Sequence, residues 1–139
     1  MKTVLQQRSE PGRIRSDIAK FVVLCVALIF IPLKAAASPC TPISLGAAPK
    51  TGAISSAGET DCFTFTGAAG DVMRVRLIKT SGTFNPFAQV FRPNGTLCAQ
   101  GFTGEFNCAV NSAGKHTILV NDFSPGTRTG TYRININKL

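Results

Sequence analysis

Short runs of alternating apolar and polar residues, separated by turn residues about every ten positions, constrain the fold of this chain most. In the run 72–79, Met73, Val75 and Leu77 are apolar, whereas Arg74 and Arg76 between them are charged. A period of two places these two sets on opposite faces of a β-strand. Beyond residue 38 no stretch has the apolar period of 3.6 that an amphipathic helix requires. The chain is therefore predicted to be all-β.

Seven such runs are bounded by Gly, Pro, Asn, Asp or Ser. They cover residues 62–66, 72–79, 87–92, 96–100, 106–110, 115–120 and 130–136. Seven or eight short strands with regular turn spacing indicate an antiparallel β-sandwich. The tripeptide 93–95, Pro-Asn-Gly, predicts a tight turn because Asn and Gly tolerate positive φ. Each strand is expected to have one buried and one exposed face.

The first 37 residues differ in composition from the rest. A polar, mainly basic segment 1–20 precedes an uncharged apolar run 21–33, and Ala35 and Ala37 fit the small-x-small pattern of a signal-peptidase site. This run is shorter than the roughly 20 residues that span a bilayer. Residues 1–37 are therefore predicted to be a signal peptide cleaved near 37/38, which meets the membrane only during export. A short, uncleaved membrane anchor is the alternative.

Residues 38–139 form the predicted mature domain, and only half of the formal net charge of +8 belongs to them. They contain nine Lys or Arg and five Asp or Glu, a net charge of +4, and the basic residues are scattered. Because a nucleic-acid site requires clustered positive charge, nucleic acid is not an expected partner. A mildly basic surface is the expected one.

Four cysteines remain once Cys25 of the apolar run is set aside. An even number in a short exported chain indicates a disulfide framework, and no pair has the close spacing of a zinc site. Cys98 and Cys108 belong to two predicted neighbouring strands, so we expect a bond between them, which leaves Cys40 and Cys62 as the second pair. The protein is expected to be secreted, periplasmic or on the cell surface, without a metal or cofactor.

The single histidine, His116, lies on the same predicted strand face as Ile118 and Val120. A packed or surface role is favoured over that of a catalytic base, which would need a carboxylate to orient it. The carboxylates of the predicted domain lie mostly at turns. They are Glu59, Asp61, Asp71, Glu105 and Asp122.

Two opposed carboxylates are the requirement for a glycosidase. Asp61 and Asp71 are interpreted instead as turn caps. Glu59, Asp61 and Asp122 are the residues to check for calcium, which needs several carboxylates to converge. Together with the single histidine, these observations predict that the protein is not an enzyme.

Five residues are candidates for binding. Arg74 and Arg76 share one face of a predicted strand, where they form either a small basic patch or an ordinary solvated surface. Phe84, Phe102 and Phe123 lie in predicted loops. Each phenylalanine either anchors its loop in the core, which is the favoured interpretation, or remains exposed and stacks on a ligand.

Several stretches resemble bacterial pre-peptidase C-terminal domains. GAISSAGETDCFTFTGAAGDVMRVRL is similar to the opening of these domains, NPFAQVFRPNGT to their hairpin, and AGKHTILVND and TGTYRINI to their last two strands. Together these segments cover about residues 43–137. Cys62 and His116 depart from the family pattern, which usually has aromatic residues there.

The resemblance implies a jelly-roll-like β-sandwich without catalytic activity. It also implies a secreted binding or accessory domain for an extracellular polymer (protein or polysaccharide) or for a partner secreted protein. The alternative function is a structural module of the cell surface or envelope without a soluble ligand.

Overall fold

The computed structural model describes residues 39–139; the candidate signal peptide lies outside the described residues and stays a prediction. This part of the chain contains nine strands and no helix, and thus no helix that could cross a membrane. The strands are β1 (Thr41–Pro42), β2 (Lys50–Ile54), β3 (Thr60–Gly67), β4 (Val72–Gly82), β5 (Pro86–Phe91), β6 (Leu97–Phe102), β7 (Gly104–Ala109), β8 (Gly114–Asp122) and β9 (Gly130–Lys138).

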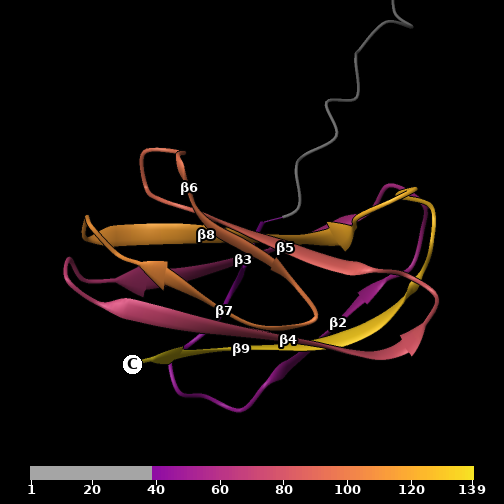
Figure 1. Ribbon diagram of the computed structural model, residues 1–139, viewed down its shortest axis with the longest axis horizontal. Helices are drawn as coiled ribbons and strands as arrows, with labels where there is room; N and C mark the ends of the chain where they lie inside the picture. The colour runs from indigo at the N-terminus through magenta and orange to yellow at the C-terminus, as the bar shows by residue number, and fades with distance from the viewer. Residues whose placement is uncertain (1–38) are drawn as a thin grey trace, which may run out of the picture. The chain divides into compact units, whose positions relative to one another are not determined.

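The strands form two sheets that lie one over the other (Figure 1). The order is β1-β3-β8-β5-β6 in the five-stranded sheet and β2-β9-β4-β7 in the four-stranded sheet. All neighbours are antiparallel except β1 and β3, which form a short parallel pair. The predicted all-β, antiparallel-rich sandwich is confirmed.

The apolar residues of the alternating runs form the core, as predicted. Met73, Val75 and Leu77 of β4 are fully buried, and so are Ile134 and Ile136 of β9 beside it. Burying each of these side chains contributes about 1.5–3 kcal/mol relative to leaving it exposed. The seven predicted runs correspond to β3–β9, with their ends shifted by a few residues.

Two strands, β1 and β2, lie outside those seven runs, so the described total exceeds the seven or eight expected. The residues of β2 alternate only weakly in polarity because Gly52 occupies an inward position opposite Tyr132. A Cβ atom on Gly52 would overlap the Tyr132 ring. Tertiary packing, rather than an alternating pattern, therefore defines this strand.

Both predicted disulfides are present, Cys40–Cys62 and Cys98–Cys108. The expectation that Cys98 and Cys108 lie on neighbouring strands of one sheet is wrong. Cys98 belongs to β6 of the five-stranded sheet and Cys108 to β7 of the four-stranded sheet. The chain changes sheets at Thr103, so the bond joins the two layers at one edge of the sandwich.

Candidate binding surface

The three candidate phenylalanines occupy different environments. Phe84 is fully buried, with its ring 6.1 Å from that of Tyr132, so it anchors its loop as the favoured interpretation stated. Phe102 and Phe123 are 45% and 53% exposed, so for them that interpretation is wrong. Phe102 is also not in a loop, because it is the last residue of β6.

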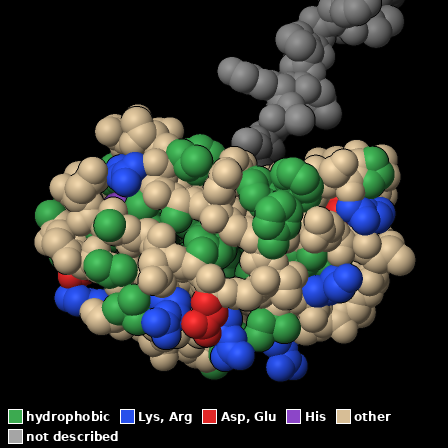
Figure 2. Space-filling model, viewed as in Figure 1, with side chains coloured by type: hydrophobic (Ala, Val, Ile, Leu, Met, Phe, Trp, Pro, Cys, Tyr) green, Lys and Arg blue, Asp and Glu red, His purple; other side chains and the backbone are tan. Residues whose placement is uncertain are grey.

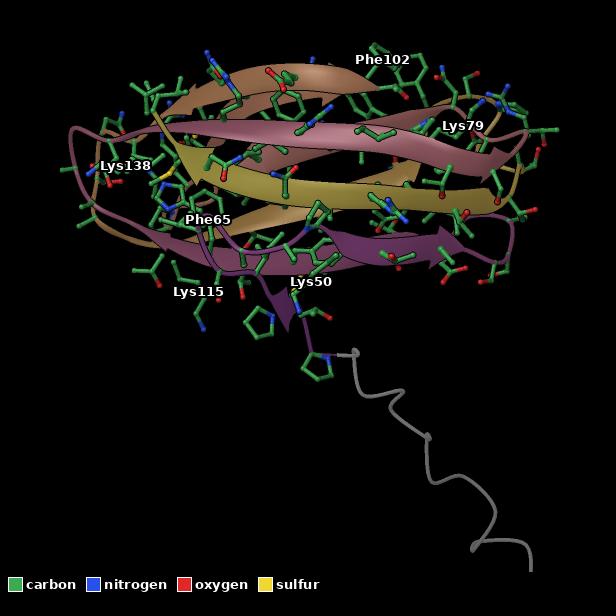
Figure 3. All side chains as sticks on the ribbon, turned by 90° about the horizontal axis from the view of Figure 1, so that it is seen from below. Lys50, Phe65, Lys79, Phe102, Lys115 and Lys138 are labelled. Carbon is green, nitrogen blue, oxygen red and sulfur yellow. A yellow bond between two sulfur atoms is a disulfide. The ribbon has the colours of Figure 1, made fainter. Side chains whose placement is uncertain are left out.

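Phe102 and Phe123 meet a third ring, Phe87 of β5, in what we call the aromatic cluster (Phe87, Phe102 and Phe123). The ring centroids are 5.1 Å apart for Phe87–Phe102, 5.1 Å for Phe87–Phe123 and 5.0 Å for Phe102–Phe123. Figure 2 shows hydrophobic side chains gathered on this side of the molecule, and Figure 3 shows Phe102 at its surface. Contiguous apolar patches on a protein surface often serve as interaction sites.

Strand register determines the position of the first two rings. Pro86 and Ala88 of β5 point inward and are buried, so Phe87 between them points outward. Phe102 of β6 is its direct cross-strand partner, which places both rings on the outer face of the five-stranded sheet. Sequence reasoning missed Phe87, although its place in an alternating run was a signal for exposure.

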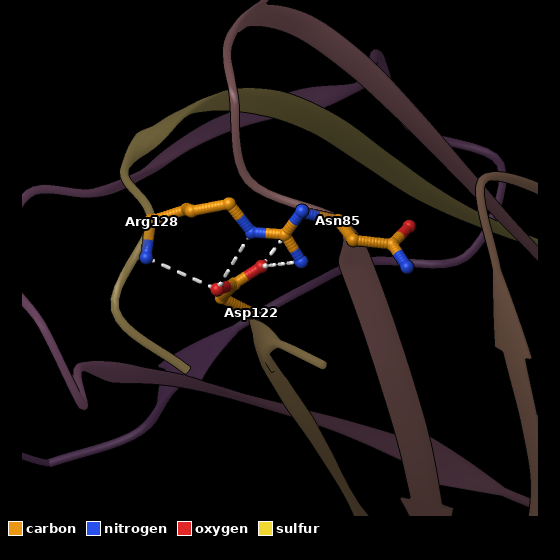
Figure 4. A network of polar contacts seen from close by, with 3 residues as sticks. All are labelled: Asn85, Asp122 and Arg128. Atoms are coloured by element: carbon orange, nitrogen blue, oxygen red, sulfur yellow. Dashed lines mark hydrogen bonds and ion pairs between the residues drawn. The ribbon is translucent and has the colours of Figure 1, made fainter. Parts of the chain in front are cut away.

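The residue before Phe123 holds the third ring in place. The buried carboxylate of Asp122 accepts hydrogen bonds from the backbone N–H of Asn85 at 2.7 Å and of Arg128 at 3.0 Å (Figure 4). The Arg128 guanidinium also contacts both carboxylate oxygens, each at 3.3 Å. In addition, the Phe123 N–H donates to the Asn85 carbonyl at 3.0 Å. These contacts position the segment that begins at Phe123.

The ionised form of Asp122 is favoured at this site. Burial alone would raise the pKa of Asp122, but the N–H donors of Asn85 and Arg128 and the charge of Arg128 hold this pKa below its ordinary value. The carboxylate is therefore charged near neutral pH, so the ion pair between Asp122 and Arg128 is intact at that pH.

Uncharged side chains continue the same face along β5 and β8. Gln89 donates to the Gln100 side chain at 3.4 Å, and Leu119 lies opposite Gln89 in the ladder. The rings of the cluster are inclined to one another by 45°, 59° and 81°. Because the three rings are inclined to one another, the aromatic cluster is a compact apolar protrusion and does not present a flat surface for stacking.

The two candidate arginines lie on the other sheet. Arg74 and Arg76 point outward from β4 and share one partner, Glu105 of β7, at 3.6 and 3.7 Å. All three side chains are about half exposed, so these pairs contribute little to stability. The arginines do not join the aromatic cluster.

A hollow with a volume of about 720 Å³ opens between β3 and β2, the latter an edge strand of the four-stranded sheet. Asp61 lines it and accepts a 2.5 Å hydrogen bond from the buried Tyr132 hydroxyl. Asp61 thus lies within β3, and its predicted role as a turn cap is wrong. Asp71 does cap a turn, through the Ala68 N–H at 3.3 Å.

Glu59 also lines this hollow, where it accepts the backbone N–H groups of Ser55 and Ser56 at 2.5 and 2.9 Å. These donors lower the pKa of Glu59. A carboxylate held ionised in this way is a poor proton donor, so Glu59 is not suited to be the general acid of a glycosidase.

His116 is packed inside the sandwich. Its ring is fully buried, stacks on Phe65 with centroids 5.0 Å apart, and contacts the Gly114 carbonyl through Nδ1 at 3.1 Å. Its Nε2 is buried without a hydrogen-bond partner among the described residues. A general base must reach the proton that it removes, and this buried ring does not face solvent.

The calcium candidates are held separately. Asp61 contacts Tyr132, Asp122 contacts Arg128, and Glu59 caps the turn at Ser55. Within residues 39–139 no three His, Cys, Asp or Glu side chains are grouped so that they could hold a metal ion.

No protein-family model and no curated protein sequence matches the chain. Solved structures do match. The pre-peptidase C-terminal domain of a collagenase from Bacillus anthracis aligns with a TM-score of 0.58 at 17% identity, over 73% of this chain and 97% of that one. The two share one fold. The resemblance to pre-peptidase C-terminal domains is thereby confirmed at the level of the fold.

Two lysozyme inhibitors have the same fold. PliG of Aeromonas hydrophila, a periplasmic inhibitor of g-type lysozyme, aligns with a TM-score of 0.54 at 20% identity, over 70% of this chain and 95% of that one. PliG of Salmonella Typhimurium aligns with a TM-score of 0.51 at 14% identity, over 71% and 97%. At these identities the likeness concerns the fold and not the site.

Proposed function

We propose that the protein is a noncatalytic, extracytoplasmic binding module that docks an exported partner protein through the aromatic cluster. The observation that carries this proposal is the exposure of Phe102 and Phe123 beside Phe87 on a rigid sheet face. Aromatic residues, phenylalanine included, are enriched in the buried centres of protein interfaces.

Pre-organisation supports a binding role. Two of the rings stand on paired strands, and the third follows the Asp122–Arg128 ion pair. A partner would therefore meet rings that need little further ordering, which reduces the entropic cost of association. The mutual tilt of the rings favours an apolar protein surface over a sugar chain, which stacks on ring faces presented in one plane.

Two further observations support the noncatalytic, exported character. The one histidine is buried, and the carboxylates of the described domain each have a structural partner. Two disulfides stabilise the domain, and such bonds persist in oxidising compartments. Proteins of this fold include inhibitors of g-type lysozyme and a domain of a collagenase.

The test compares two double variants of the purified protein. Phe102→Ala/Phe123→Ala removes the two exposed rings, and Val72→Ala/Ile78→Ala, the control, trims two residues that are each 36% exposed on the other sheet. A g-type lysozyme is the first partner to assay, by binding and by inhibition of lysis, followed by affinity capture from an exported-protein fraction. We expect the phenylalanine variant to weaken binding at least about tenfold and the control to bind normally.

Equal retention of the partner by both variants would exclude the aromatic cluster as the docking site. Retention of the protein on an insoluble polysaccharide, with loss of retention in the phenylalanine variant, would replace the protein partner by a sugar polymer. Turnover of peptide, ester or glycoside substrates by the purified protein would contradict the noncatalytic assignment.

A further inference from the structure

A second feature of the same sheet face lies toward the other end of β5. A shallow depression of about 550 Å³ has an apolar floor made by Phe91 and Leu119, with Pro93 at one side. Lys115 and Arg92 line it as well, and Figure 3 shows Lys115 projecting away from the sandwich. Two cations therefore border an apolar surface.

The wall of the depression is formed by a well-ordered turn between β5 and β6. The Arg92 N–H donates to the Thr96 carbonyl at 2.8 Å, and the Gly95 N–H donates to the Arg92 carbonyl at 2.9 Å. The Asn94 side chain also accepts the Thr96 N–H at 3.0 Å. The depression is thus largely pre-formed, as is usual for ligand sites.

The cations of the depression have no anionic partner in the described domain. None of its five side-chain carboxylates lines the depression, and each of them contacts a partner elsewhere. Arg92 donates through Nη1 to the Leu97 carbonyl, while its Nε–H is buried without an acceptor among residues 39–139. A buried donor without an acceptor is costly, so an external anion would supply what the domain itself lacks.

We infer that this depression binds the C-terminal residue of a peptide when that residue is apolar. The α-carboxylate would pair with Lys115 and, after a rotation of the guanidinium, with the Nε–H of Arg92. The side chain would cover Phe91 and Leu119. In a single C-terminal residue the α-carboxylate and the side chain lie close together. Such a residue therefore fits a depression in which the cations lie beside the apolar floor. A long fatty chain would need a longer apolar groove.

The experiment is an NMR titration of the purified protein with N-acetyl-leucine as the probe. N-acetyl-leucinamide keeps the apolar side chain without the charge, and acetate keeps the charge without the side chain. We expect saturable shifts of the amides of Gly95, Lys115, Thr117 and Leu119, with a Kd in the millimolar range typical of so small a ligand. The amide and acetate should each bind about five- to tenfold more weakly.

Matched variants test the charge directly. Lys115→Gln should weaken N-acetyl-leucine binding about three- to tenfold, and Lys50→Gln, at the edge strand β2 of the other sheet, should leave it unchanged. Equal binding of acid and amide, no effect of Lys115→Gln, or shifts centred away from the depression would each overturn the inference. Decanoate binding more than about tenfold tighter than N-acetyl-leucine would also overturn it, in favour of a fatty acid. The titration does not depend on the aromatic cluster or its partner.

Discussion

Cys98 and Cys108 form a disulfide between the two sheets of the sandwich, with their Cα atoms 5.5 Å apart. The bond closes the edge at which β6 and β7 meet. Phe106 of β7 lies over Gly101 of β6 at the same edge, where a Cβ atom would overlap its ring. Because Phe102 follows Gly101 directly, the edge that the disulfide closes also supports part of the aromatic cluster.

Removal of this disulfide should destabilise the fold and disturb the cluster. The bond spans ten residues, so Cys98→Ser/Cys108→Ser should lower the free energy of unfolding by about 3 kcal/mol on the chain-entropy estimate. Urea unfolding measures this change. Cys40→Ser/Cys62→Ser is the control, because it should cost a similar free energy while leaving the NMR signals of Phe102 unchanged. Unchanged Phe102 signals in both variants would contradict the proposed support.

Truncation of single phenylalanines should distinguish core from surface. Phe84→Ala removes a fully buried ring and should cost about 3–5 kcal/mol of unfolding free energy, because it leaves a cavity. Phe123→Ala removes a half-exposed ring and should cost less than about 1 kcal/mol. Thermal or urea unfolding of the two variants gives the comparison. A larger loss for Phe123→Ala than for Phe84→Ala would show that the cluster is structural.

The Asp122–Arg128 ion pair should make stability depend on pH in the acid range. The pKa of Asp122 is lowered in the folded protein from its ordinary value of 3.8, so the unfolded state binds the proton more readily. This contribution is fully present above pH 3.8 and is lost as pH falls through the lower folded-state pKa.

Asp122→Asn should therefore lower the melting temperature by several degrees at neutral pH. The difference from the natural protein should shrink as the pH falls below 3.8. Melting curves across this range measure both effects. A constant difference at every pH would show that the charge of Asp122 is not what stabilises the segment.

Tyr132, the only tyrosine of the chain, should report alkaline unfolding. Burial and the hydrogen bond to Asp61 raise the pKa of Tyr132 above its ordinary value of 10.0. Its contribution to stability is complete below pH 10.0 and diminishes as pH rises above that value toward the folded-state pKa. Tyrosinate absorbance should therefore appear together with the loss of circular dichroism. Tyrosinate absorbance in a protein that remains folded would contradict the buried hydrogen bond. The variant Tyr132→Phe, which has no tyrosine, gives the background absorbance.

Local pattern was sufficient for the faces of the strands. The alternation of Met73, Val75 and Leu77 with Arg74 and Arg76 predicted which side chains are buried, because successive residues of any strand point to opposite sides. The same rule applied to 87–92 would have placed Phe87 outward. Both predicted cysteine pairs are present, although the reason given for Cys98 and Cys108, neighbouring strands of one sheet, did not hold.

Phe84 and Phe123 illustrate the limit of this reasoning, since both were predicted to lie in loops and to be anchors. Phe84 packs within the sandwich core against Tyr132, which is 48 positions further along the chain, whereas Phe123 turns outward toward Phe87 and Phe102. A loop has no period that assigns its side chains to one side. Their burial therefore depends on residues that only folding brings near.

The sequence by itself determined the all-β class and the strand faces, because both depend on the local alternation of apolar and polar residues. Only the tertiary structure decided that Cys98 and Cys108 join opposite sheets, that β2 pairs with β9 and that Phe87, Phe102 and Phe123 meet in one cluster. The physical reason is that strand order and loop direction come from packing between segments distant in sequence, and one chain's local pattern is compatible with many such arrangements.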